Sequence, residues 1–578
     1  MAIDPRSGFC QQTKTFHSLR PPTPFPPPHQ PLSITQFVLS LLHSSTIPTT
    51  TTTTYLTIPS TAQSLTYSQA IDQIYSLSSS LKNHYSLNNN DVAFILCPPS
   101  LHVPILYFSL LYLGVTISPA NPLSSDSELA HQIQLCKPVI AFATSQTAHK
   151  LPSLPQGTIV VDSPEFTSLT HPKPQTTHPQ VEVSQSDVAA ILYSSGTTGR
   201  VKGVALTHRN LITLISGFHH NKAVPDPNQP GPPPVSLLIL PLFHVFGFFK
   251  SINAFSIGET LVLMERFDFV DMLKCVEKYR ITHMPVSPPL IVAFVKADLT
   301  KKYDLSSLKT LGCGGAPLGK EVADALKEKF PHLEIVQGYG LTETGGGATR
   351  TIGPEESRQL ASVGRLSENM EAKIVDPETG EALGLGQRGE LWLRGPTVMK
   401  GYVGDEKATA ETLLPDGWLK TGDLCYFDSE GFVYIADRLK ELIKYKAYQV
   451  PPAELEKLLQ SNPEIADAAV IPYPDEEAGQ IPMAYVVRKP GSNITEAQIM
   501  DSIAKQNSDH MADFPFSFLI SSPPLIRLPD GRDFPENVAP YKKIRRVAFI
   551  SAIPKSPAGK ILRRELVNHA LSGASSKL

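Results

Sequence analysis

The chain has 578 residues and a formal net charge of −3, and 41% of its residues are hydrophobic. The length suggests several structural units, and the hydrophobic content supplies a sizeable core, which excludes a disordered or fibrous protein. The nearly balanced charge gives no bulk attraction to nucleic acid or to an anionic membrane surface.

The N-terminal stretch is rich in proline, with six prolines between Pro21 and Pro28. Proline fixes φ and lacks a backbone donor, so such a cluster cannot continue a helix or the interior of a sheet. Residues 1–32 are therefore predicted to be a disordered leader, and the first folded domain is predicted to begin at residue 33.

A buried-strand pattern over 188–193 runs into a loop that combines glycines, hydroxyl residues and a lysine, and His208 then opens an amphipathic helix. Glycines allow successive N–H groups to surround an anion, hydroxyls add donors, and the lysine adds positive charge. The spacing differs from that of a P-loop NTPase, so the pattern predicts a phosphate-binding loop of another kind. The loop residues assigned to phosphate are Ser194, Ser195, Gly196, Thr197, Thr198, Gly199 and Lys202.

The stretch 194–203 resembles the signature loop of the acyl-adenylate-forming superfamily, and most closely that of plant 4-coumarate–CoA ligases and their 4-coumarate–CoA ligase-like relatives. The similarity runs from about Leu56 to Val567. Alternating strands and helices favour an α/β fold. The resemblance implies a large N-terminal domain of two α/β subdomains plus a β-barrel-like subdomain, and a small mobile α+β lid. The expected boundaries are 33–436 for the adenylation domain, 437–571 for the lid and 572–578 for a tail.

On the acyl side, the resemblance implies that His244 forms a gate or pocket wall with a part in catalysis, and that Phe246 lines the acyl tunnel. An isolated histidine in an apolar run is more often a core residue, which leaves a second interpretation of His244. The other residues assigned to the acid are Lys250, Gly315, Gly346 and Gly347, and Arg266 is assigned to a CoA phosphate.

The glycine-rich segment 337–344 follows a strand-like stretch. The resemblance implies that Tyr339 stacks on adenine, Thr342 binds the α-phosphate and Glu343 holds Mg²⁺, which takes few protein carboxylates together with phosphate oxygens. Further nucleotide contacts are assigned to Gln337, Gly338, Asp423 and Arg438, the last two at the ribose.

The charged segment 437–446 resembles the joint between the large domain and the lid. The resemblance places Lys440 at the hinge, around which the lid rotates between half-reactions. It assigns Lys444 and Gln449 to the adenylate, and Lys446 with Ala447 to the CoA side. Lys560, in the motif 555–561, is implied to be the catalytic lysine, because a cation stabilises the negative charge that develops during adenylation.

Three departures from the family pattern bear on function. Gly345–Gly347 replaces Gly-Pro-Val of true 4-coumarate–CoA ligases, which predicts a wider acyl tunnel. Ala447 stands where the family usually has Gly, which puts CoA use in question. An insertion at 507–537 interrupts the lid without a clear helical or alternating period, as expected of a retained intron or a surface loop.

The chain ends in Ser576-Lys577-Leu578, which matches the peroxisomal import signal read by an import receptor, so we expect a peroxisomal protein. The longest apolar runs are broken or too short for a membrane span of about 20 residues.

The predicted function is an ATP- and Mg²⁺-dependent acid–CoA ligase with CoA as co-substrate, acting on a hydroxycinnamate-like, fatty or oxylipin-type acid. The alternatives are a luciferase-like adenylate oxygenase and a catalytically impaired nucleotide-binding homologue.

Overall fold

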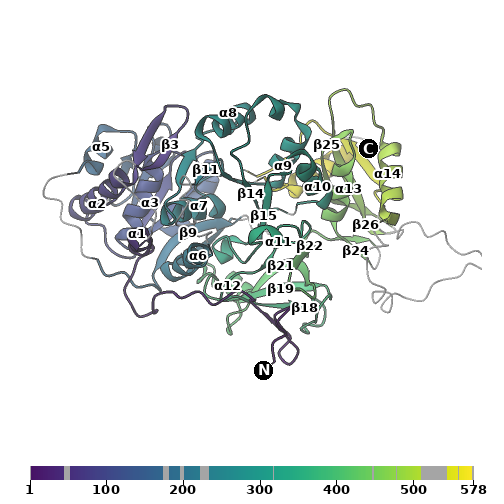
Figure 1. Ribbon diagram of the computed structural model, residues 1–578, viewed down its shortest axis with the longest axis horizontal. Helices are drawn as coiled ribbons and strands as arrows, with labels where there is room; N and C mark the ends of the chain where they lie inside the picture. Colours follow the sequence, from purple (N-terminus) through teal and green to yellow (C-terminus); the bar gives the residue numbers. More distant parts are fainter. Residues whose placement is uncertain are drawn as a thin grey trace, which may run out of the picture. The chain divides into compact units, whose positions relative to one another are not determined.

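The computed structural model describes residues 2–44, 53–172, 181–194, 201–221, 234–316, 318–445, 448–476, 478–509, 543–556 and 559–575 (Figure 1). The chain forms two compact units. The first comprises Met1–Thr421 and Tyr426–Tyr434, and the second comprises Gly422–Cys425 and Ile435–Leu578. The chain therefore passes between the units three times. No helix in the described ranges is long and apolar enough to cross a membrane.

The first unit contains a seven-stranded sheet with a parallel centre, in which β5 pairs with both β6 and β7. The sequence of β5, Val-Ala-Phe-Ile-Leu, is a continuous apolar run, as expected of a strand covered on both faces. In spatial order the strands are β20 (Gly401–Tyr402), β10 (Lys202–Thr207), β9 (Val188–Ser194), β6 (Thr116–Pro119), β5 (Val92–Leu96), β7 (Ile140–Ala143) and β8 (Thr158–Val160).

A nine-stranded sheet forms the second layer of strands in this unit, and its central strands are also parallel. Both sheets contribute to one hydrophobic core together with helices α1, α2, α3, α6 and α7. In spatial order the strands are β17 (Arg365–Leu366), β16 (Thr349–Arg350), β15 (Glu334–Tyr339), β14 (Thr310–Cys313), β13 (His283–Val286), β11 (Val235–Leu238), β12 (Thr260–Leu263), β3 (Thr54–Ile58) and β4 (Gln63–Thr66).

Several helices of the first unit begin at a residue whose side chain accepts a hydrogen bond from the first turn. Thr66, Ser125 and Thr207 each form a capping box with the residue three positions later. The helices are α1 (Ile34–Ser44), α2 (Tyr67–His84), α3 (His102–Tyr112), α4 (Asp126–Cys136), η1 (Ala148–Lys150), α5 (Pro164–Thr170), α6 (His208–His220), α7 (Val245–Ser256), α8 (Phe269–Tyr279), α9 (Pro288–Lys296), η2 (Asp298–Lys302), α10 (Lys320–Lys329), η3 (Thr342–Thr344), α11 (Gly353–Glu356) and α12 (Glu406–Thr412).

A six-stranded sheet occupies the place of the expected β-barrel-like subdomain. Its strands in spatial order are β1 (Phe9–Cys10), β2 (Thr15–His17), β18 (Glu371–Val375), β19 (Gly389–Arg394), β21 (Leu419–Phe427) and β22 (Val433–Arg438).

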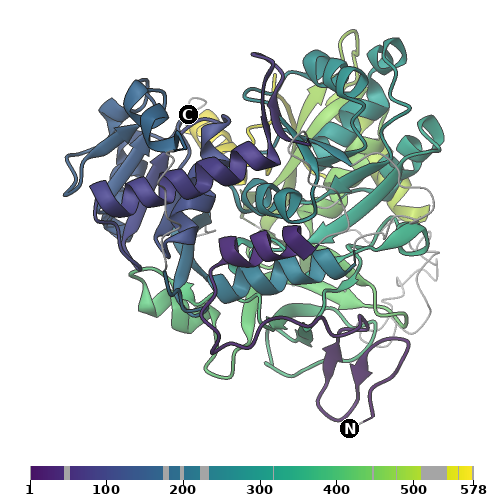
Figure 2. The ribbon, with the colours of Figure 1, turned by 60° about the vertical axis from the view of Figure 1, so that its left-hand side comes forward.

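The first two strands of this sheet correct the prediction of a disordered leader over 1–32. β2 pairs with β18, and Phe16 lies opposite Ala372. Phe16 is fully buried and stacks on Phe427, with ring centroids 4.0 Å apart. The segment then runs from this hairpin to α1 along the first unit (Figure 2).

The proline-rich part of the segment is also held, although it forms neither helix nor strand. Ser216 Oγ donates to the Pro24 carbonyl at 2.9 Å, and Gln185 Nε2 donates to the Pro27 carbonyl at 2.8 Å. Proline has no N–H to donate, but its carbonyl still accepts. Side-chain donors from α6 and from the segment before β9 therefore fix an extended proline-rich chain that cannot pair as a strand.

The second unit is an α+β layer. Its sheet consists of β24 (Tyr448–Val450), β23 (Ile443–Tyr445), β26 (Gly479–Arg488) and β25 (Ile465–Asp475) in spatial order, and β27 (Arg546–Phe549) pairs with β26. Its helices are α13 (Pro452–Ser461), α14 (Glu496–Asp509) and α15 (Arg563–Ser575). Leu455 and Leu459 of α13 pack with Ala484 and Val486 of β26 in its core.

Candidate active site

The two ends of the predicted phosphate loop lie side by side, because Ser194 and Lys202 are register partners in the antiparallel pair β9–β10. Ser194 Oγ donates to Glu343 Oε1 at 3.2 Å. The structure thus joins the loop to η3, which is 149 residues further along the chain. The five loop residues Ser195–Gly199 lie outside the described residues.

Tyr402 of β20 completes this group, and sequence reasoning did not identify it. Its hydroxyl donates to Glu343 Oε1 at 2.8 Å, and the ammonium of Lys202 lies 4.5 Å from its ring centroid. Burial, reinforced by the Glu343 carboxylate, holds the pKa of the Tyr402 hydroxyl well above its ordinary value, so it stays a donor. Serine, lysine, tyrosine and glutamate from four elements therefore converge at one place.

The surroundings of Glu343 fit Mg²⁺ bound with a nucleotide. Among the described residues, the hydrogen bonds to its carboxylate, from Ser194 and Tyr402, end on Oε1, so Oε2 is the oxygen placed to act as a hard ligand. Among the described residues, no cluster of three or more His, Cys, Asp or Glu could hold a metal ion. A single carboxylate suits Mg²⁺, which is commonly held by one or two carboxylates plus substrate phosphates.

The segment 337–339 is the C-terminal part of β15, and it is backed by β16, with Gly338 opposite Arg350 and Tyr339 opposite Thr349. The Gln337 amide donates to the Leu360 carbonyl at 2.6 Å, so this side chain fastens the strand to the segment before β17. Thr342 is nearly buried and opens η3.

The glycine turn after η3 packs against α6 and α7. Gly346 has a φ of +98°, which a side chain rarely adopts, and a Cβ at Gly347 would lie 2.8 Å from Leu214 Cδ1. The backbone conformation therefore favours glycine at Gly346, and a side chain at Gly347 would require Leu214 to move. A wider acyl tunnel stays a prediction.

His244 is the N-cap of α7. Its Nδ1 accepts from the Phe246 N–H at 3.3 Å. Burial lowers the pKa of His244, so the ring is neutral near pH 7 with its proton on Nε2. Phe246 lies against Gly314, where a Cβ would be 3.4 Å from the ring and 3.6 Å from the Gly338 carbonyl. Gly315 follows with a φ of +86°. The predicted acyl and nucleotide segments are thus neighbours.

Among the described residues, the ion-pair partner of Lys250 is Glu259, which lies outside this group. Lys250 is buried and its Nζ lies 2.8 Å from Glu259 Oε2, and Ser236 also donates to that carboxylate. This ion pair lies beside β11, which contains Ser236, and Glu259 directly precedes β12. Arg266 is exposed after β12.

In the second unit, three predicted residues come together although they lie far apart in sequence. Arg438 Nε is 3.3 Å from Asp423 Oδ1. Burial, together with the charge of Arg438, lowers the pKa of Lys560 to about 8, while Asp423 and Glu441 act in the opposite direction. The Lys560 carbonyl also accepts from the Ser556 N–H at 2.7 Å.

Arg563, three residues after Lys560, is the centre of a buried charge cluster that sequence reasoning missed. It donates to both oxygens of Glu456 at 2.8 and 2.7 Å, and its other terminal nitrogen is 2.8 Å from Glu441. Asp437 lies close enough to raise the pKa of Arg563 and has its own pKa raised to about 6 by burial. The cluster joins α15, α13 and the turn after β22.

Lys444 and Gln449 are register partners in the hairpin β23–β24. Lys440 and Lys444 are exposed. Lys446 and Ala447, most of the insertion (510–537) and the terminal Ser576–Leu578 lie outside the described residues.

Comparison with protein-family models matches residues 48–403 to the AMP-binding enzyme family and residues 454–528 to the AMP-binding enzyme C-terminal domain. The chain is 58% identical to 4-coumarate–CoA ligase-like 9 of Arabidopsis thaliana, covering 100% of this chain and 98% of that protein. It is 42% identical to peroxisomal OPC-8:0-CoA ligase 1 of Arabidopsis thaliana, covering 99% of each. Its fold is similar to that of the anthranilate CoA ligase AuaEII in complex with anthranoyl-AMP, with a TM-score of 0.78, 22% identity, and coverage of 95% of this chain and 99% of that one.

Proposed function

This chain belongs to the AMP-binding enzyme family, and we propose on that basis that it is an ATP-dependent acid–CoA ligase. In the proposed reaction a carboxylic acid is first joined to AMP, and its acyl group is then passed to the thiol of CoA. The relatives named as CoA ligases support this activity.

One observation carries the proposal at the level of geometry: Ser194 of the phosphate loop donates to Glu343, and Lys202 stands beside them over Tyr402. A cation and one carboxylate, whose Oε2 has no hydrogen-bond partner among the described residues, form a suitable set for a metal-bound polyphosphate. We assign phosphate binding to Thr342 and the described loop ends, and extend the assignment to Ser195–Gly199.

The first half-reaction overcomes the low electrophilicity of a carboxylate, whose negative charge is delocalised. A carboxylate oxygen attacks the α-phosphorus of ATP, the bond to the β-phosphate oxygen breaks, and pyrophosphate leaves with the bonding electrons. The ammonium of Lys560 stabilises the negative charge that develops. Glu343 would hold Mg²⁺, which when bound would neutralise part of the phosphate charge. Asp423 and Arg438 hold the ribose, and Tyr339 stacks on adenine.

The second half-reaction uses the thiol of CoA. The thiolate attacks the acyl carbon, the bond between that carbon and the phosphate oxygen breaks, and AMP leaves. All six cysteines of the chain are buried, in keeping with a reaction that needs no protein thiol. Lys440 serves as the hinge residue in this proposal. The residues assigned to the adenylate and CoA in this step are Lys444, Gln449, Lys446 and Ala447.

We propose a fatty or oxylipin-type acid as substrate, with a hydroxycinnamate-like acid as the other class. The glycines at 345–347 and the relative named OPC-8:0-CoA ligase support the first class. We also propose import into peroxisomes through Ser576–Leu578, which the word peroxisomal in that relative's name supports.

The test is acid-dependent exchange of labelled pyrophosphate into ATP, followed by CoA-dependent release of AMP, over a panel of fatty, oxylipin-type and hydroxycinnamic acids. The panel is run on the full chain and on a variant without residues 507–537. A chain that exchanges pyrophosphate with none of the acids in either form contradicts the proposal. Light emission with oxygen and acyl-AMP, without thioester formation, would favour an oxygenase.

A further inference from the structure

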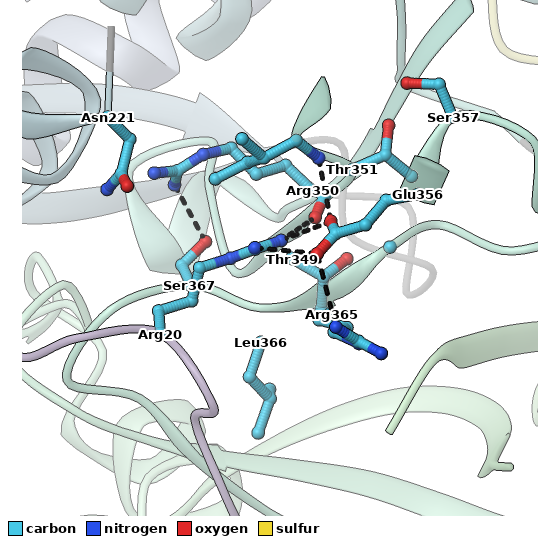
Figure 3. Close-up of polar contacts among 12 residues, drawn as sticks. Arg20, Asn221, Thr349, Arg350, Thr351, Glu356, Ser357, Arg365, Leu366 and Ser367 are labelled. Atoms are coloured by element: carbon cyan, nitrogen blue, oxygen red, sulfur yellow. Dashed lines mark hydrogen bonds and ion pairs between the residues drawn. The ribbon is translucent and has the colours of Figure 1, made fainter. Parts of the chain in front are cut away.

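Arg20, in the N-terminal segment 2–32, contacts β16 and α11, and β16 pairs with the predicted nucleotide strand β15. Its two terminal nitrogens lie 2.9 and 2.7 Å from the two oxygens of Glu356, the last residue of α11. One of them also donates to the Arg350 carbonyl of β16 at 2.8 Å. Figure 3 shows Arg20 and Arg365 approaching the Glu356 carboxylate from different directions. Arg20 therefore binds both ends of the segment 350–356, through the Arg350 carbonyl and the Glu356 carboxylate.

This segment is fastened to β15 along its length. The Thr351 N–H donates to the Gln337 carbonyl at 2.8 Å, and the Gln337 N–H donates to Thr351 Oγ1 at 3.0 Å. Ser357 Oγ donates to Glu334 Oε1 at 2.8 Å. Any shift of 350–356 would be passed to the strand that ends in Tyr339.

The side chain of Arg350 links β16 to α6 and to the segment after β17. Its guanidinium donates to both oxygens of Glu368 at 2.8 Å and lies 4.2 Å from the Phe218 ring centroid. Phe218 in turn lies 3.8 Å from the position of a Cβ on Gly347. The backbone held by Arg20 is thus the backbone that places Arg350 beside the glycine turn.

The ion pair between Arg20 and Glu356 is mostly buried. The side chains of Arg20 and Glu356 are 10% and 12% exposed. Burial acts to raise the pKa of Glu356, but hydrogen bonds and charge from Arg20 outweigh it and hold the pKa below its ordinary value. Removing Arg20 would leave a buried carboxylate with fewer partners, which is strongly unfavourable. The segment 352–356 would then move to solvate it.

We propose that Arg20 is a positioning residue of the nucleotide site, which holds β16 and α11 so that the Gln337–Tyr339 strand presents the adenine face. This inference rests on the proposed function, because it takes 337–339 as part of the ATP site. It assigns a role in substrate binding to a segment whose sequence is predicted to be a disordered leader.

The experiment measures ATP binding to the full-length chain by calorimetry in the absence of acid, so that no knowledge of the acid is needed. Arg20→Met is expected to weaken ATP binding about tenfold, the scale of one lost charge-assisted hydrogen bond. Arg20→Lys keeps the charge but cannot fork between Glu356 and the Arg350 carbonyl, so an intermediate loss of about threefold is expected. Where an acid is turned over, the KM for ATP should rise while the KM for the acid stays within about twofold.

Two controls separate positioning from loss of stability. Arg6→Met removes another Arg–Glu ion pair of the same segment, that with Glu430, and should leave ATP binding unchanged. Phe16→Leu disturbs the stacking on Phe427 and should lower the melting temperature without weakening ATP binding.

Equal ATP affinity in wild type and Arg20→Met, or an equal loss in Phe16→Leu, overturns the inference and leaves the proposed function intact. If Arg20→Met does not fold, Arg20→Lys and Arg20→Gln decide by the same comparison. A wild-type chain that does not bind ATP overturns the proposed function and this inference together.

Discussion

At the scale of single residues, Glu343 is the point at which distant parts of the chain meet. Ser194, Tyr402 and Glu343 come from β9, β20 and η3, and both donors share the oxygen Oε1. Among the described residues, Oε2 has no hydrogen-bond partner. In the proposed site, Oε1 would therefore hold Ser194 and Tyr402, and Oε2 would bind Mg²⁺.

Glu343→Gln is expected to lower the rate of adenylate formation about a hundredfold, because the amide keeps an acceptor for Ser194 and Tyr402 but loses the charge that holds Mg²⁺. Pyrophosphate exchange measured against Mg²⁺ concentration should show a higher Mg²⁺ requirement. Glu355→Gln, which changes an exposed carboxylate of α11, serves as the control. An unchanged Mg²⁺ dependence in Glu343→Gln would contradict the assignment.

Lys560 has a pKa lowered to about 8, chiefly by burial and then by Arg438. The protonated form is the one that stabilises phosphate charge, so the rate of adenylate formation should fall as the pH rises through about 8. Lys560→Arg should move this fall to higher pH, because guanidinium stays charged. The measurement is the pH profile of single-turnover adenylate formation.

Lys560→Ala should lower adenylate formation by about a hundredfold or more while sparing thioester formation from supplied acyl-AMP. The two half-reactions are assayed separately for this purpose. Equal losses in both would mean that the residue acts through folding or in a shared step.

At the scale of elements, Arg563 ties three parts of the second unit together. It is paired with Glu456 of α13 and with Glu441 after β22, and its Nε donates to the Val470 carbonyl of β25 at 3.2 Å. Lys560 lies three residues before Arg563 in the chain. The placement of the lysine therefore depends on the cluster.

Arg563→Met is expected to destabilise the second unit by about 3–5 kcal/mol, because the buried carboxylate of Glu456 and the partly buried carboxylate of Glu441 lose their partner. Guanidinium-induced unfolding, followed by a probe placed in this unit, measures the loss. Arg564→Met is the matched control, since that neighbour is exposed on the same helix. Similar losses in both variants would argue against the cluster.

Sequence alone predicts those elements whose signal is local. The apolar run of β9 and the hydroxyl- and glycine-rich loop after it indicate a strand and a phosphate site, and the comparisons bear out the family. Tyr402 and Arg563 give no such signal, because an aromatic in a short strand and an arginine at a helix start are common on any surface. Their roles arise from partners supplied by other elements.

The segment 1–32 shows a different limit. Proline content predicts the absence of regular pairing, and between Pro21 and Pro28 there is none. Proline content does not predict whether side-chain donors elsewhere in the chain will bind the proline carbonyls. The donors that do so, Ser216 and Gln185, lie 192 and 158 residues away.

At the scale of the whole molecule, removal of residues 2–32 should destabilise the first unit by about 3–5 kcal/mol or more, since the loss includes at least one fully buried phenylalanine. The melting temperature of the truncated chain measures this. Removal of residues 576–578 is the control for shortening as such. A truncated chain that melts together with wild type would show that the segment contributes little to stability.

The ion pair between Arg20 and Glu356 also sets an order of events during biosynthesis. Arg20 leaves the ribosome early, whereas Glu356 follows 336 residues later, on the order of half a minute at ordinary translation speeds. Phe16 must wait longer still for Phe427, with its ring facing water or a chaperone. Arg20 and Phe16 are thus made well before the residues that they contact, and slow or stalled translation between Phe16 and Phe427 would leave an apolar hairpin open to aggregation.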